Sequence, residues 1–241
     1  MKLEAIDNHL LPSDAVVGIT ASASPASIEA IGIRKLRLNG FRNYPHLEVK
    51  TQAKAVLLTG ANGAGKTNLL EALSMLAPGR GLRRAGREEL GYRAPQAQQP
   101  ENWTIFAEIH GHHGPSFIGT GVSEHIEKGR AIRIDHAPAS QNDLLDRISL
   151  SWLTPQMDGL FLAAPSQRRR FLDRLAMTFD PAHNGRLLRY EKAWRERNHL
   201  LQEQIRDESW LHAIEQILAE TGVALMATRA QMLADICRIS Q

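Results

Sequence analysis

Short apolar runs with the alternation typical of β-strands occupy the sequence from residue 31 onward. Residues 31–38 fit a strand with one irregular step, and Asn39-Gly40 after them is a strong turn signal. Residues 47–49 fit the returning strand of a hairpin. Residues 56–58 form a continuous apolar run in front of a glycine-rich loop, which predicts a buried strand.

The apolar spacing then becomes helical and ends at a Pro-Gly pair. Four leucines carry this period: Leu69, Leu70, Leu73 and Leu76. Residues 80–101 are rich in Arg, Gly, Pro and Gln and are predicted to be mostly loop. Strand-like segments at 103–109, 117–118 and 131–134 predict an antiparallel meander, and residues 148–153 are apolar enough for one more buried strand.

From residue 166 onward the pattern is helical. Five apolar residues with a spacing close to a heptad are expected to form the core of a helical hairpin: Leu187, Tyr190, Trp194, Leu201 and Ile205. Polar residues 206–209 interrupt this pattern, and a second helix is predicted from Leu211 through Leu233.

These patterns divide the chain into three parts. Residues 1–30 include an Ala-, Ser- and Pro-rich run without an apolar period and are predicted to be a disordered extension. Residues 31–165 are predicted to form an α/β domain, and residues 166–241 a helical arm. A length of 241 residues with 43% hydrophobic and 23% charged residues excludes a collagen-like or wholly disordered chain.

Composition and charge narrow the setting. No apolar run approaches the length of a membrane-spanning helix, so no membrane partner is expected. The single cysteine, Cys237, excludes an internal disulfide framework and, with no secretory signal in the sequence, favours a cytoplasmic location. Residues 31–95 hold twelve Lys and Arg residues against four Asp and Glu residues, which fits either a phosphate-bearing partner or a solvated basic face.

One motif carries recognisable chemistry. Residues 60–67 match the phosphate-binding pattern G-x-x-x-x-G-K-[ST] between a predicted strand and a predicted helix. They are Gly60, Ala61, Asn62, Gly63, Ala64, Gly65, Lys66 and Thr67. The glycines let backbone N–H groups point at a phosphate, Lys66 places a charge on the β- and γ-phosphates, and Thr67 can ligate Mg²⁺. We therefore expect ATP and Mg²⁺ as cofactors.

A complete P-loop ATPase also needs an acidic residue after an apolar strand. The nearest approach downstream is Ile-Arg-Ile-Asp at 132–135, in which Arg133 interrupts the apolar run. The sequence therefore predicts ATP binding and shows no evident group for ATP hydrolysis.

Several separated motifs resemble one protein family. In order along the chain they are GFRNY at 40–44, TNLLEA at 67–72, WLTP at 152–155, SQRRRFLD at 166–173, and Tyr190 followed by RNHLL at 197–201. Together with the phosphate-binding loop they resemble the N-terminal half of the RecF family of DNA replication and repair proteins, which are ABC/SMC-like ATPases.

The resemblance implies an α/β fold: the N-terminal half of a P-loop ABC-type ATPase head, a mixed sheet with an antiparallel meander, followed by a helical-hairpin arm. It implies that Arg42 and Asn43 lie near the nucleotide. It also implies binding of single-stranded or gapped DNA and support of recombinase loading with RecR and RecO. The family's signature motif and Walker B acid belong to a C-terminal half outside this sequence, so an ATP-dependent homodimer is expected of the full-length protein.

Four further residues are candidates by position. Arg83, Arg84 and Arg87, just past the P-loop helix, could contact DNA phosphates or belong to a solvated loop. Gln156 could sense Mg²⁺ and the γ-phosphate, as a glutamine does in ABC heads, or be an ordinary loop residue.

Two other functions fit the same loop. The chain could be a fragment that binds ATP and DNA, or a partner, without hydrolysing ATP. It could also be a P-loop small-molecule kinase, although residues 41–44 and the helical hairpin argue against that reading.

Overall fold

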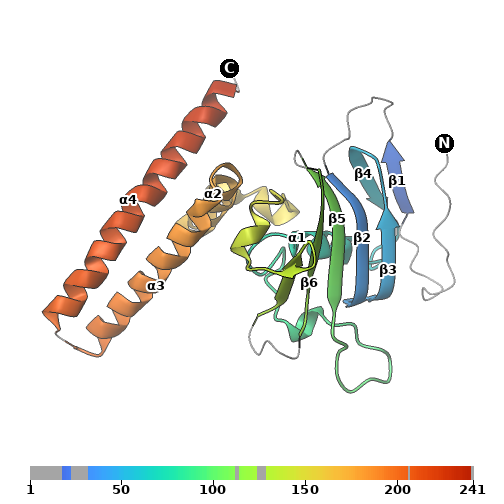
Figure 1. The fold of residues 1–241 in the computed structure, drawn as a ribbon, viewed down its shortest axis with the longest axis horizontal. Helices are drawn as coiled ribbons and strands as arrows, with labels where there is room; N and C mark the ends of the chain where they lie inside the picture. The colour runs from blue at the N-terminus through green and yellow to red at the C-terminus, as the bar shows by residue number, and fades with distance from the viewer. Residues whose placement is uncertain (1–17, 23–31, 112–113, 124–128, 206, 240–241) are drawn as a thin grey trace. The chain divides into compact units, whose positions relative to one another are not determined.

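The computed structural model describes residues 18–22, 32–111, 114–123, 129–205 and 207–239 (Figure 1). The chain divides into two compact units, Met1–Leu150 and Ser151–Gln241, which are described separately below. The sequence pattern begins the helical arm at residue 166, whereas the structure groups residues 151–165 with the helices. Among the described residues, no helix is both long and apolar enough to cross a membrane.

A six-stranded sheet in the order β3-β2-β5-β6-β7-β8 forms most of the first unit. Its strands are β2 (Gly32–Phe41), β3 (Tyr44–Lys50), β5 (Thr104–Gly111), β6 (Gly114–Gly121), β7 (Ala131–Ile134) and β8 (Ala137–Pro138). Every neighbouring pair is antiparallel, which confirms the predicted meander. Its strands run side by side in Figure 1.

The two faces of this sheet differ in polarity, because alternate residues of a strand point to opposite faces. Leu36 and Leu38 of β2 and Ile105 of β5 are buried on one face. On the other face, Arg37 pairs with Glu48 of β3 across the strand ladder. One face of the sheet therefore carries the core and the other meets water.

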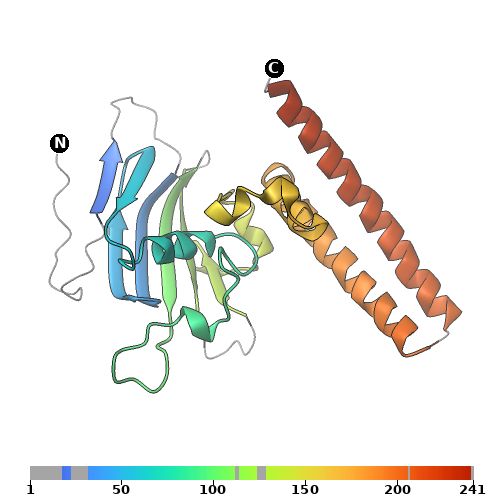
Figure 2. The same cartoon turned by 180° about the vertical axis from the view of Figure 1, so that it is seen from behind.

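Helix α1 (Lys66–Ser74) covers part of the apolar face (Figure 2). Leu69 and Ala72 of this helix are buried in the same core as Phe41 and Trp103. Arg130 holds the C-terminal end of the helix, since its guanidinium donates to the carbonyl oxygens just after the last turn, those of Met75 and Ala77. Burial lowers the pKa of Arg130 to about 10. Its two bonds satisfy carbonyl oxygens that directly follow the helix and would otherwise need partners.

Strand β4 (Ala55–Thr59) pairs antiparallel with β1 (Gly18–Ser22) in a separate two-stranded sheet. Within residues 1–30, predicted to be disordered, the structure therefore places 18–22 in a strand, which suits the β-branched Ile19 and Thr20. The remaining residues of 1–30 lie outside the described ranges. Residues 56–58 form a strand, as predicted, but the prediction that this strand is buried is wrong. Val56 is 43% exposed and Leu57 62% exposed, because among the described strands β4 pairs with β1 alone.

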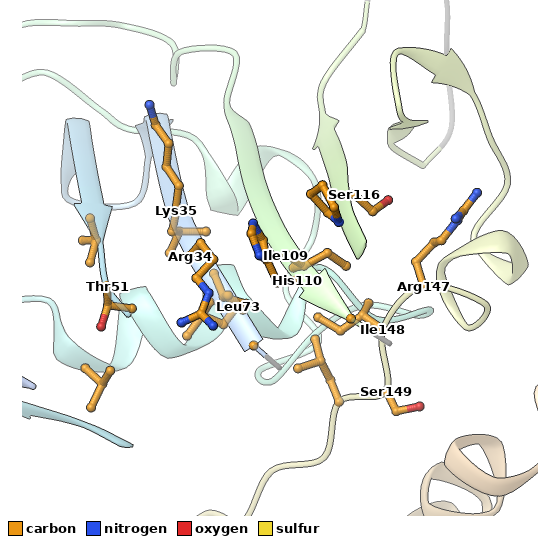
Figure 3. A pocket seen from close by; sticks show the side chains of 18 of the residues that line it. Arg34, Lys35, Thr51, Leu73, Ile109, His110, Ser116, Arg147, Ile148 and Ser149 are labelled. Carbon is orange, nitrogen blue, oxygen red and sulfur yellow. The ribbon is translucent and has the colours of Figure 1, made fainter. Parts of the chain in front are cut away.

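An apolar cavity of about 780 Å³ lies between α1, β4 and the uncovered part of the sheet. Figure 3 shows side chains that line it from distant segments, among them Leu73, Ile109 and Ile148. Residues 148–153, predicted to be a buried strand, form no strand; Ile148 and Leu150 pack against the core while Leu153 is 79% exposed. Apolar content alone did not distinguish a covering loop from a strand.

Short 3-10 helices connect the larger elements of both units. They are η2 (Glu88–Leu90), η3 (Asn142–Leu144), η4 (Pro155–Met157) and η5 (Leu160–Leu162).

The second unit is helical, as predicted, and consists of α2 (Pro165–Phe179), α3 (Ala182–Gln202) and α4 (Glu208–Ile239). Helices α3 and α4 run side by side as a hairpin (Figures 1 and 2). Their contact is formed by Ala193, Leu200 and Ile214. The heptad-like stripe predicted as the hairpin core is therefore wrong in part, because Trp194 and Leu201 are about half exposed. The small Ala193 lets the helices approach, and the larger residues beside it remain outside the contact.

A buried charged cluster ties all three helices together. Asp173 of α2 accepts hydrogen bonds from His183 of α3 at 2.9 Å and from Arg229 of α4 at 2.8 Å. Burial alone would raise the pKa of Asp173, but the bonds from His183 and Arg229 outweigh it and hold that pKa below its usual value. The folded helical unit therefore stabilises the ionised form of Asp173.

Candidate nucleotide site

The loop from Gly60 to Gly65 joins the end of β4 to the start of α1, as the motif predicts. Its backbone is left-handed at three glycines, with φ of 141° at Gly60, 86° at Gly63 and 103° at Gly65. Residues other than glycine rarely adopt such φ values. The Ala64 N–H donates to the Ala61 carbonyl oxygen at 3.2 Å and closes the turn of the loop. The positive end of α1 therefore opens directly onto the loop.

The Lys66 ammonium reaches back over this loop. Its Nζ donates to the carbonyl oxygens of Gly60 at 2.8 Å and Ala61 at 2.7 Å. Thr67 follows as the second residue of α1 and is exposed. The loop thus brings an ammonium group, a helix N-terminus and an accessible hydroxyl together within eight residues of sequence.

The turn between β2 and β3 packs against the end of the loop. A Cβ atom at Gly65 would lie 2.5 Å from Asn43 Nδ2 and 2.5 Å from the Tyr44 hydroxyl oxygen, so only glycine fits there. Asn43 also donates to the Ala64 carbonyl oxygen at 3.5 Å, a long contact. The Tyr44 hydroxyl is buried and has no hydrogen-bond partner in the described part of the chain, and burial raises its pKa.

Arg42 in the same turn is fixed by a carboxylate of α1. Its Nε and Nη2 donate to the two carboxylate oxygens of Glu71 at 2.9 and 2.8 Å, and its Nη1 donates to the Glu89 carbonyl oxygen at 2.7 Å. Glu71 is 1% exposed. Arg42 has a left-handed backbone, with φ of 55°, which is uncommon for a residue other than glycine. This bidentate pair fixes both the position and the plane of the guanidinium.

Arg83 enters the same network from the loop after α1. Its Nη1 donates to Asn68 Oδ1 at 2.8 Å and to Glu71 Oε2 at 3.2 Å. Asn68 in turn donates to Asn43 Oδ1 at 2.8 Å. The structure thus brings Arg42, Asn43 and Arg83 together beside the phosphate-binding loop.

The other predicted residues lie elsewhere. Arg84 is exposed with a left-handed φ of 58°, and Arg87 donates to the Ser123 carbonyl oxygen at 3.4 Å. Gln156 lies in η4 of the second unit. Asp135, the nearest approach to an acid after an apolar strand, accepts from Ser116 and from the Phe117 backbone N–H, so it serves the meander.

The sequence alone indicates no role for Glu71. The available signal was a charged side chain among the apolar positions of α1, but that pattern cannot name its partner. Arg42 lies 29 residues away in sequence and reaches Glu71 only once β2, β3 and α1 have packed. The unpaired Tyr44 hydroxyl was equally invisible, because burial of one atom has no sequence signature.

The residues present fit a nucleoside triphosphate with a divalent cation. Three left-handed glycines, one ammonium and the helix N-terminus form a cradle for phosphate oxygens. A threonine hydroxyl at the helix start is an oxygen ligand of the kind Mg²⁺ accepts. Among the described residues, no group of three His, Cys, Asp or Glu side chains could hold a metal by protein ligands alone.

Fold and site together define the class: the chain is an α/β protein with an antiparallel sheet and a phosphate-binding loop between β4 and α1. A family profile described as an AAA domain matches residues 35–99. Over most of its length the chain matches the N-terminal portion of the DNA replication and repair protein RecF.

Relatives in both sequence and structure support that match. RecF of Brucella abortus strain 2308 is 46% identical over 206 residues, covering 85% of this chain and 53% of the relative. RecF of Mesorhizobium japonicum is 47% identical over 203 residues, covering 83% and 52%. A solved structure of the recombination mediator protein RecF with ATP, in the RecFOR pathway, superposes with a TM-score of 0.71 at 22% identity, covering 88% of this chain and 56% of that one. The chain therefore spans about half the length of the relatives it matches.

Proposed function

We propose that this chain binds ATP and Mg²⁺ at the loop 60–67 and contributes to a RecF-type function in DNA recombination and repair. The observation that carries the proposal is the meeting of Lys66, the α1 N-terminus and three left-handed glycines at one loop. Lys66, now donating to two loop carbonyls, would donate to the β- and γ-phosphates instead. The Thr67 hydroxyl would ligate Mg²⁺.

Bound Mg²⁺ would supply charge neutralisation for the phosphates. The rest of the site's work falls to this chain's own residues. Asn43 and the left-handed Gly65 hold the second half of the loop, and Arg42 stands beside it with its guanidinium fixed. Gln156, in the other unit, is proposed as an additional contact to Mg²⁺ or the γ-phosphate on the family resemblance alone.

Binding to DNA is proposed through the arginines after α1. Arg84 is exposed, and the side chain of Arg83 is 44% exposed although it is paired with Glu71. Arg87, part of whose side chain is engaged with Ser123, is the third candidate. Contacts from this loop would go to backbone phosphates and would not read base sequence. The relatives' names support DNA repair as the setting, and RecR, RecO and a second copy of the full-length protein are the proposed partners in a cytoplasmic pathway.

The test of the nucleotide site is Lys66→Ala, with binding of a fluorescent ATP analogue measured in the presence of Mg²⁺. We expect the variant to lose at least about 100-fold in affinity, because it removes a charge-assisted contact to two phosphates. Lys54→Ala is the matched control, since Lys54 is an exposed lysine outside the loop. Equal affinities of wild type and Lys66→Ala would overturn the site assignment.

The same preparation distinguishes the remaining candidate functions. ATP binding without release of inorganic phosphate would favour a non-hydrolysing ATP- and DNA-binding role, in line with the use of Asp135 in the meander. Transfer of the γ-phosphate to a small acceptor, seen by chromatography of the products, would favour a kinase.

A further inference from the structure

A buried carboxylate beside the phosphate-binding loop has no part in the contacts proposed for ATP. Glu71 is 1% exposed and pairs with Arg42 and Arg83. A carboxylate is costly to bury unless it is paired and hydrogen-bonded. Glu71 meets that condition with two guanidinium groups, one of them bidentate.

The first branch of this cluster controls Arg42. Glu71 binds two of its nitrogens and the Glu89 carbonyl binds a third, so the guanidinium has one orientation. The left-handed backbone of Arg42 is a strained conformation that the surroundings must hold in place. The bond to Glu71 is the strongest described contact available to hold it.

The second branch leads back to the loop. Arg83, held by Glu71, fixes the amide of Asn68 by donating to its oxygen. The Asn68 nitrogen then donates to Asn43 Oδ1, which leaves Asn43 Nδ2 directed at the Ala64 carbonyl. In each amide the oxygen accepts and the nitrogen donates, so all the bonds from Arg83 to Ala64 run in one direction. Glu71, which holds Arg83, therefore fixes the orientation of both amides.

We propose that Glu71 is the positioning residue of the nucleotide site. It holds Arg42 directly, and through Arg83, Asn68 and Asn43 it holds Ala64 and Gly65 in the conformation that receives phosphate. This inference rests on the proposed binding of ATP for its effect on affinity, but the effect on loop conformation exists without nucleotide. Loss of the Glu71 charge frees both arginines and lets the amide chain change direction.

The primary experiment is a double-mutant cycle of Glu71→Gln and Arg42→Gln, read by affinity for MgATP. We expect Arg42→Gln to lose about tenfold in affinity and Glu71→Gln to lose more, because it breaks both branches. The double variant should lose no more than Glu71→Gln alone, because Arg42 acts here through its bond to Glu71. Glu88→Gln is the control, because Glu88 is exposed and the substitution removes the same negative charge. A loss in the double variant equal to the product of the two single losses, or no loss in Glu71→Gln, would overturn the proposal.

A second measurement needs no nucleotide. Amide hydrogen exchange of residues 60–68 in the nucleotide-free protein is expected to be faster in Glu71→Gln and in Asn68→Ala than in wild type, and unchanged in Glu88→Gln. Asn68 is only partly buried, so its variant still tests the second branch if Glu71→Gln does not fold. Unchanged hydrogen exchange in Asn68→Ala would contradict the second branch, from Arg83 through Asn68 and Asn43 to the loop. If wild type itself fails to bind ATP, the proposed function falls, and the exchange experiment alone decides on Glu71.

Discussion

Two glycines of the phosphate-binding loop are required for different reasons. Gly63 and Gly65 are both left-handed, with φ of 86° and 103°. A Cβ at Gly63 would meet nothing within 4 Å, whereas at Gly65 it would lie 2.5 Å from both Asn43 and Tyr44. The first glycine is needed for its backbone alone, and the second for its backbone and for the space that a side chain would take.

We therefore predict that Gly65→Ala destabilises the protein more than Gly63→Ala. Gly63→Ala should cost about 1 kcal/mol of unfolding free energy from strain, and Gly65→Ala about 3 kcal/mol, because the β2–β3 turn must also move. Urea unfolding followed by the fluorescence of the buried Trp103 measures both. Equal losses of stability in the two variants would show that contact with the turn contributes nothing.

Among the elements, the three helices of the second unit depend on one ionised group. The pKa of Asp173 is held below its usual value of about 3.9 in the folded state, so the unfolded chain takes up a proton first as the pH falls. The stabilisation is complete above about pH 5 and is lost as the pH drops through the folded pKa, below about pH 4.

Asp173→Asn should remove this stabilisation at neutral pH. We expect a loss of about 3 kcal/mol at pH 7, because the buried His183 and the partly buried Arg229 are left without their carboxylate. The difference between variant and wild type should shrink as the pH falls toward about 3. Urea unfolding followed by helical circular dichroism checks both statements. Asp235→Asn, which alters a more exposed pair within α4, is the matched control and should change stability little.

The elements also show what the sequence could and could not predict. The strand–loop–helix order around residues 60–67, the meander and the two long helices followed from local periodicity, because spacing determines which face of an element is buried. The heptad-like stripe of α3 was placed in the hairpin core, yet the contact uses Ala193, because close approach favours a small side chain there. The exposure of residues 56–58 and the link from Arg42 to Glu71 depend on neighbours distant in sequence, which periodicity cannot supply.

Across the whole molecule, charged residues are unevenly distributed along the chain. The excess of Lys and Arg lies in residues 31–95, within the unit that carries the phosphate-binding loop. A binding surface built from such residues acts through displacement of counterions from nucleic acid.

Binding of single-stranded DNA should therefore weaken with salt. We expect the affinity to fall by about tenfold or more between about 50 and 200 mM salt, and Arg84→Gln to reduce the slope of this dependence by about one. Fluorescence anisotropy of a labelled oligonucleotide measures both quantities. Arg238→Gln, on the helical arm, should leave the slope unchanged; a slope that Arg84→Gln does not alter would remove Arg84 from the DNA surface.

The apolar cavity beside α1 has a practical consequence for handling the chain. Leu70 and Val56, which line it, are nearly half exposed, so an apolar patch is in contact with water. Stable monomers normally keep such exposed apolar patches small. We expect this patch to promote self-association of the chain as its concentration rises. Solubility therefore matters as much for the purification of this chain as preservation of the nucleotide site does.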